Sequence, residues 1–240
     1  MEIRNNTPNI NFNAKLIAKA VTHVGKKEIK LYNLDASDKD FAKKMVSKVD
    51  LGALYPNLDD YSGFAAWKHI IKTSVDKVGV DNVVLATHNK RPCGILVYKK
   101  NSHKTFHLTN LATWPIKENI KAPHAGKVLM HSIFTQAKLD KIDSIYLLPS
   151  QFKPLGKSCL DFYQPLGFKS KDVGLMPYVA LENVDYSVKT AQLENFFDVK
   201  FLENSKNVDL NKELSLEFKD TFTEKIVGLF NKLKNKSLSK

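Results

Sequence analysis

Residues 112–133, ATWPIKENIKAPHAGKVLMHSI, join two segments that differ in hydrophobic period. The apolar stretch FHLTNLA, at 106–112, enters them and predicts a β-strand. Residues 125–142 repeat apolar side chains at helical spacing and predict an α-helix. The first amides of a helix lack internal partners and the helix dipole favours anions there. The order strand, loop, helix therefore indicates a phosphate site, with the alternative that the sequence HAG only begins a helix.

The remaining periodicities predict an α/β (α+β) domain around a mixed, partly antiparallel sheet flanked by helices. Residues 82–100 predict a hairpin, because two apolar runs flank the turn sequence HNKRP. Ser37 and Asp40 form a capping-box pattern at the start of the first helix. The other expected strands lie at 27–35, 104–114, 144–150 and 175–183, and the expected helices at 37–51, 64–78, 125–142 and 156–168.

Both ends of the chain look like additions to this core. We expect an N-terminal extension at 1–26, a core at 27–183 and a partly helical C-terminal extension at 184–240. Residues 14–21, AKLIAKAV, suggest a short helix, and the tail carries an apolar helical face. We expect this tail to pack on the core or to mediate self-association, and a helix on a membrane surface is the alternative.

Composition narrows the class of protein. The chain has 240 residues, 43% of them hydrophobic, which is enough for a sizeable core. No stretch approaches the ~18 apolar residues that a membrane span needs, and the polar N-terminus has no secretory pattern. Cys93 and Cys159 are the only cysteines, so neither a disulfide framework nor a metal-ligand spacing is indicated. We expect a cytoplasmic protein with no metal site.

The formal net charge of +12 is compatible with nucleic acid, an acidic membrane surface or an anionic ligand as a partner. The lysines are spread along the chain, and no known DNA-binding motif is present. We therefore favour a lysine-rich surface over a nucleic-acid or membrane contact, and we leave a homodimer open.

Four stretches, taken in order, resemble the GNAT superfamily of acetyl-CoA-dependent N-acetyltransferases. The resemblance covers about 27–182. VVLATHNKRPCGILVY resembles the second and third strands of that family, with Gly94 opening the third, and LTNLATWP resembles the fourth. KAPHAGKVLM resembles the acetyl-CoA loop, and DFYQPLGF resembles a late helix end. The sequence departs from the family at Lys121, where Arg or Gln is usual, at His124, where the first glycine is usual, and at Gly156, where many members carry asparagine.

The resemblance implies a site for acetyl-CoA (coenzyme A). The loop would hold its pyrophosphate through the cofactor-binding residues Lys121, His124, Ala125, Gly126 and Lys127. Small residues let a backbone approach phosphate closely, and histidine tolerates positive φ better than most side chains.

The resemblance also implies that pantetheine lies beside the fourth strand. Main-chain groups of Leu111, Ala112 and Thr113 would bind it, and a backbone N–H there would stabilise the thioester oxygen as it becomes negative. The alternative is an ordinary buried strand.

Two side chains are catalytic candidates. Tyr163 matches the position where many family members place a tyrosine near the sulfur, and it would protonate the leaving thiolate; the alternative is a core tyrosine against Leu166 and Phe168. His107 is the preferred general base, because an imidazole titrates near neutrality, and the alternative is a histidine bonded within the sheet. Glu118 is a second candidate for the base.

We therefore expect an N-acetyltransferase that moves an acetyl group directly to a primary amine of a small molecule, peptide or protein. The region at about 50–70, which contains two aspartates, would help to form the acceptor side. The alternative is a GNAT-like binding protein with little catalysis, which uses a basic surface to bind a partner such as nucleic acid.

Overall fold

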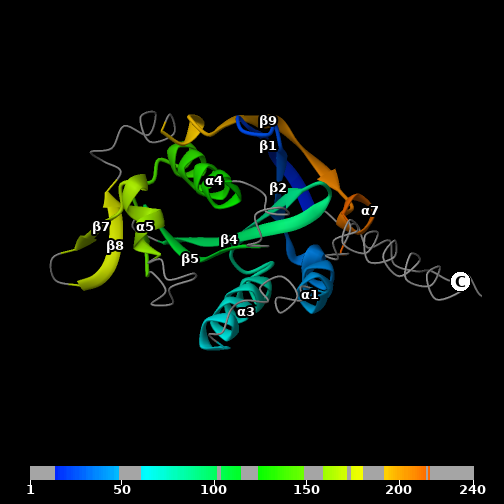
Figure 1. The fold of residues 1–240 in the computed structure, drawn as a ribbon, viewed down its shortest axis with the longest axis horizontal. Helices are drawn as coiled ribbons and strands as arrows, with labels where there is room; N and C mark the ends of the chain where they lie inside the picture. The colour runs from blue at the N-terminus through cyan, green and yellow to red at the C-terminus, as the bar shows by residue number, and fades with distance from the viewer. Residues whose placement is uncertain are drawn as a thin grey trace, which may run out of the picture.

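The computed structural model describes residues 14–48, 61–101, 104–114, 124–148, 159–171, 174–180, 192–214 and 216. These residues build a mixed, mostly antiparallel sheet with helices on both faces (Figure 1). The α+β class and the partly antiparallel sheet expected from the sequence are confirmed.

Among the described residues, nine strands form one sheet in the order β7-β8-β6-β5-β4-β3-β2-β1-β9. Of these nine, β5 and β6 pair in parallel, and the other neighbouring pairs are antiparallel. In chain order the strands are β1 (Ala14–Thr22), β2 (Glu28–Leu34), β3 (Asn82–His88), β4 (Arg91–Asn101), β5 (Thr105–Thr113), β6 (Ser144–Leu147), β7 (Lys169–Lys171), β8 (Gly174–Ala180) and β9 (Phe197–Val208).

The helices divide the core into two layers. Helix α4 (Ala125–Leu139) packs on one face of the sheet, where it buries Val128, Leu129 and Ile133. Helices α1 (Lys39–Lys48) and α3 (Tyr61–Asp76) cover the opposite face (Figure 1). The described chain also contains the short helices η1 (Ala36–Asp38), α5 (Leu160–Tyr163), η3 (Gln164–Leu166) and α7 (Leu210–Glu213).

The helix expected at 14–21 is wrong, because these residues form strand β1. Alternate residues from Ala14 to Thr22 are buried, which is the period of a strand with one covered face. β1 pairs with β2 on one side and with β9 on the other. Residues from both expected extensions thus pair within the sheet, while the division into a core and two extensions remains a prediction.

The capping box at the first helix lies two residues earlier than predicted. The Asp35 carboxylate accepts the Ser37 N–H at 2.8 Å, and Asp38 accepts the Asp35 N–H at 3.0 Å. Asp35, and not Ser37, is the N-cap residue, because a 3₁₀ turn precedes α1 and needs a cap of its own. The other strands and helices expected between 27 and 183 each overlap an observed element. The tail helix, expected beyond 219, lies outside the described residues.

Asp38 couples this cap to pH. Its side chain is fully buried, and its Oδ1 has no hydrogen-bond partner among the described residues. Burial raises the pKa of Asp38 to about 6 from an ordinary 3.8. The folded protein therefore holds this proton more tightly than the unfolded chain, and the stability that Asp38 contributes falls as pH rises from about 4 to 6.

We predict that Asp38→Asn raises stability relative to the wild type more at pH 7 than at pH 4.5, because the amide keeps an acceptor oxygen and carries no charge. The change between the two pH values should be on the order of 1 kcal/mol or more, since one pKa unit corresponds to about 1.4 kcal/mol. Urea unfolding of both proteins measures it, with the exposed Asp40→Asn as the control. A pH-independent difference would contradict the assignment.

Candidate active site

Strand β5 contains one residue more than its partner β4 at the centre of the sheet. Val97 pairs with Asn110, but the next residue, Tyr98, pairs with Leu108, so Thr109 is the extra residue of a β-bulge. The Thr109 hydroxyl donates to the Val97 carbonyl oxygen at 3.2 Å. A bulge re-aims side chains and often lies beside a functional site.

The bulge changes which side chains of β5 lie on each face of the sheet. Before it, Phe106 and Leu108 pack in the core layer under α4. After it, Leu111 packs against that same layer, whereas Ala112 belongs to the layer under α1 and α3. The simple alternation of a regular strand therefore holds only up to Leu108.

The described pairing of β5 with β6 ends at the same point. Among the described residues, the last pair is Leu108 with Leu147, whereas β5 continues along β4 to Thr113. The Trp114 N–H donates to the Cys93 carbonyl oxygen of β4 at 2.9 Å. Because peptide groups alternate along a strand, the N–H of Leu111 points to the other edge, toward the β6 side. The end of β5 thus directs main-chain groups away from β4, beyond the last pair with β6 among the described residues.

Helix α4 begins beside this strand end. His124 is its N-cap residue and has left-handed backbone angles, φ 63° and ψ 13°. Histidine is among the residues enriched in this conformation, so it occupies a glycine-like position at modest cost. Its side chain does not cap the first turn of the helix, and its ring packs against Phe196 instead. The amides of Ala125 and Gly126 open the helix.

Two glycines bring the four quoted stretches together. A Cβ at Gly126 would lie 3.3 Å from the Phe162 ring and 3.6 Å from Thr113 Cγ2. A Cβ at Gly94 would lie 3.0 Å from Leu129 Cδ1 and 3.2 Å from Thr113 Cγ2. β4, the end of β5, the start of α4 and α5 therefore converge at one place.

Tyr163 lies in α5, next to this convergence. Its half-buried ring packs edge-on against Phe168 with centroids 5.5 Å apart, as the packing alternative predicts. Burial, with a smaller contribution from Cys159, raises the pKa of the Tyr163 hydroxyl above its ordinary value. The phenol therefore stays protonated at neutral pH and is able to donate.

His107 lies just before the bulge. It is in register with Lys99 on β4 and Tyr146 on β6, and its ring stacks on Tyr146 with centroids 4.5 Å apart. Burial, and then the charge of Lys99, lowers the pKa of His107 below its ordinary value, so the imidazole is neutral at pH 7. Alternation with Phe106 and Leu108 directs it to the face opposite the layer in which Tyr163 packs.

Sequence reasoning missed two contributors to this region. The Asn110 amide donates to the Thr73 and Ser74 hydroxyl oxygens at 2.9 and 3.0 Å and so fixes α3 on β5. Phe196 lies over Lys127, whose ammonium nitrogen is 3.4 Å from the ring centroid. Burial lowers the pKa of Lys127. No local pattern signals either contact, because each joins segments far apart in the sequence.

Some predicted residues lie outside the described part of the chain, namely Lys121, Glu118 and Gly156. Within the described ranges, no group of three His, Cys, Asp or Glu side chains is arranged to hold a metal ion. None of the helices described has the length and apolarity that crossing a membrane requires.

No family model matches the sequence, and no curated protein does. The structure matches the PaiA N-acetyltransferase of Thermoplasma acidophilum, solved with coenzyme A, at 17% identity and a TM-score of 0.42, over 63% of this chain and 98% of the other. It matches a GNAT family acetyltransferase of Brucella melitensis, solved with acetyl-CoA, at 15% identity and a TM-score of 0.42, over 63% and 87%.

A GNAT family acetyltransferase of Staphylococcus aureus matches at 17% identity and a TM-score of 0.41, over 64% of this chain and 99% of the other. Many GNAT acetyltransferase structures thus match most of the chain, at identities too low to transfer their activity to it.

Proposed function

We propose that this protein is an N-acetyltransferase, which moves an acetyl group from acetyl-CoA directly to a primary amine of a small molecule, peptide or protein. The observation that carries the proposal is the convergence of Gly94, Thr113, Gly126 and Phe162 where β5 leaves β6. That convergence combines the end of β5, a helix N-terminus and a protonated phenol in one region.

The described residues fit the cofactor. Ala125 and Gly126 offer small side chains and helix-opening amides that would hold the pyrophosphate, with charge from Lys127 and, outside the described residues, Lys121. His124 contributes backbone in the left-handed conformation that a glycine would otherwise supply. The main chain of Leu111, Ala112 and Thr113 would bind the pantetheine arm as a neighbouring strand does.

When bound, acetyl-CoA supplies an activated acyl group. The Leu111 N–H points to the edge where the thioester would lie and would stabilise negative charge on its oxygen. Neutral His107 would take the proton of the attacking amine, directly or through water, and Tyr163 would donate a proton to the departing thiolate. Because these two side chains lie on opposite faces of the sheet, the amine and the leaving group would occupy opposite sides of the thioester.

A second candidate is a binding protein with a basic surface. Lys19 pairs across the sheet with Lys30 on one side and Lys200 on the other. Like charges directly opposite each other destabilise a sheet, so this row favours an anionic partner such as nucleic acid. Glu213 binds Lys30 at 2.9 Å and offsets part of the charge. We favour the enzyme, because the packing at Gly94 and Gly126 supports it. We place this enzyme in a reducing cytoplasm, where Cys93 and Cys159 remain thiols.

The first prediction of this proposal concerns the loop. Acetyl-CoA should raise the melting temperature of the wild type, because a ligand that binds only the folded state stabilises it by about 2.7 kcal/mol at 100 times its dissociation constant. Gly126→Glu should abolish this rise, because bulk and negative charge would meet the phosphates. Lys138→Glu, at the exposed far end of α4, is the matched control and should keep it. An undiminished rise in folded Gly126→Glu would remove the loop from the site.

The second prediction concerns the acid. Tyr163→Phe should lower kcat by about 10²–10⁴-fold, the usual contribution of a positioned acid or base. The affinity for acetyl-CoA should stay nearly constant, since the ring and its packing on Phe168 survive. Thiol release with an amine acceptor found by screening measures it. Tyr98→Phe removes a hydroxyl from the buried core of β4 and serves as the control. If Tyr163→Phe keeps full turnover while chemistry is rate-limiting, the Tyr163 hydroxyl has no catalytic role and the ring contributes only packing.

The third prediction concerns the base. Wild-type kcat/KM should fall on the acidic side as His107 becomes protonated, with a midpoint below 6.5 because burial and Lys99 lower its pKa. His107→Gln should depress the rate most above that midpoint and flatten the acidic limb. His88→Gln, in the β3–β4 hairpin, is the control. An unchanged acidic limb in His107→Gln would assign the base to another group.

A further inference from the structure

An aromatic side chain from the C-terminal part of the chain lies on the first turn of α4. The Phe196 ring is 38% exposed and immediately precedes β9. Its centroid is 5.1 Å from that of the His124 ring and 3.4 Å from the Lys127 ammonium nitrogen. Phe196 therefore contacts both described side chains that flank the helix-opening amides of Ala125 and Gly126.

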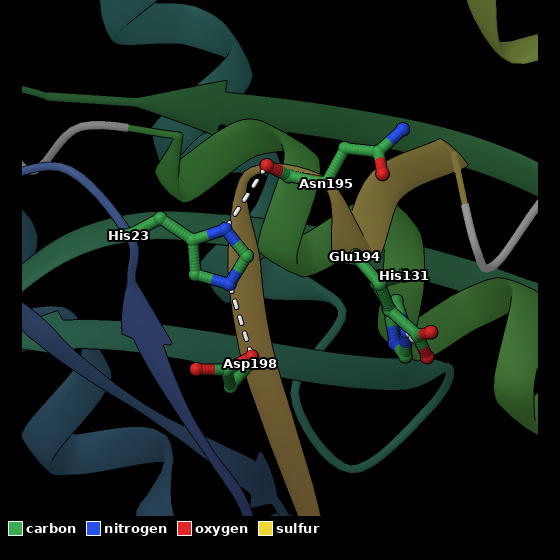
Figure 2. A network of polar contacts seen from close by, with 5 residues as sticks. All are labelled: His23, His131, Glu194, Asn195 and Asp198. Atoms are coloured by element: carbon green, nitrogen blue, oxygen red, sulfur yellow. Dashed lines mark hydrogen bonds and ion pairs between the residues drawn. The ribbon is translucent and has the colours of Figure 1, made fainter.

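The backbone around Phe196 is held in place by His23, which lies in the turn between β1 and β2. The His23 N–H donates to the Phe196 carbonyl oxygen at 3.0 Å. Its ring places Nδ1 3.0 Å from the Asn195 carbonyl oxygen and Nε2 2.9 Å from the Asp198 carboxylate (Figure 2). Main-chain and side-chain contacts of one histidine thus fix residues 195–198.

A second histidine attaches the same segment to the middle of α4. His131 is buried, and its Nε2 lies 3.4 Å from the Glu194 carboxylate (Figure 2). Its ring packs against Phe197 and Phe201 of β9, with centroids 5.7 Å away in both cases. Phe196 is therefore presented to the helix start by a segment that is anchored on both sides.

A negatively charged group near Lys127 would stabilise its ammonium group. It lies in the first turn of α4, where the helix dipole disfavours a cation, and its side chain is half-buried. An aromatic face attracts an ammonium group and leaves its other sides open to an anion. The contact also restricts a side chain that would otherwise lose much rotamer freedom when a ligand binds.

We propose that Phe196 is a positioning residue for coenzyme A. The Phe196 ring holds the Lys127 ammonium and the His124 side chain where they meet the phosphates of the cofactor. This inference rests on the proposed function. It makes the segment that leads into β9 a part of the cofactor site, although the family-like stretches end before it.

A double-mutant cycle tests the inference, with coenzyme A binding to the full chain measured by calorimetry. Phe196→Leu should weaken binding by about threefold to tenfold, the range that a cation–π contact supports. Phe196→Trp should retain wild-type affinity, because it keeps an aromatic face. In the Lys127→Met background, Phe196→Leu should have a smaller effect than alone. Lys138→Glu, at the exposed far end of α4, is the control and should bind as the wild type does.

The outcomes separate this inference from the proposed function. If the wild type binds coenzyme A and Phe196→Leu binds it with unchanged or higher affinity, the positioning role is overturned and the cofactor assignment stands. Equal losses in the two backgrounds, or a loss in Phe196→Trp as large as in Phe196→Leu, would overturn it as well, because general packing would then explain the effect. Failure of the wild type to bind coenzyme A would overturn both proposals.

Discussion

The extra residue in β5 is the constraint on which the site depends. Without Thr109, strict alternation would continue along the strand, and Leu111 would leave the layer under α4. With it, the strand keeps apolar contacts under the helix both before and after the bulge. Among the described residues, the parallel pairing with β6 ends just before the bulge. One inserted residue thus keeps the face of β5 on which α4 is seated apolar on both sides of the bulge.

Close approach is the second requirement, and Gly94 and Gly126 both meet it. A side chain at Gly94 would press on Leu129 and Thr113, and one at Gly126 would press on the Phe162 ring. Two positions without a Cβ, one in the sheet and one in the helix, thus let β4, α4 and α5 approach the end of β5 closely.

The sequence predicted most of this architecture where the signal is local. The hairpin, α4 and the end of α5 follow from short patterns, and Gly167 closes η3 with a φ of 94° as a glycine after a helix should. β1 was mistaken for a helix because a short run of alanine, lysine and aliphatic residues fits either period, and its partner β9 lies far along the chain. The bulge could not be predicted, since an extra residue exists only relative to the strand beside it.

The first and last strands of the described chain pair with each other, and local sequence patterns do not predict this pairing. β1 and β9 pair at one edge of the sheet, and the turn after β1 supplies His23, which fixes the residues before β9. Those residues include Phe196, which lies on His124 and Lys127. A change at the N-terminal turn is therefore two contacts away from the start of α4. Because His124 holds left-handed backbone angles at the N-cap, its packing on Phe196 links the first turn of α4 to the edge strands of the sheet.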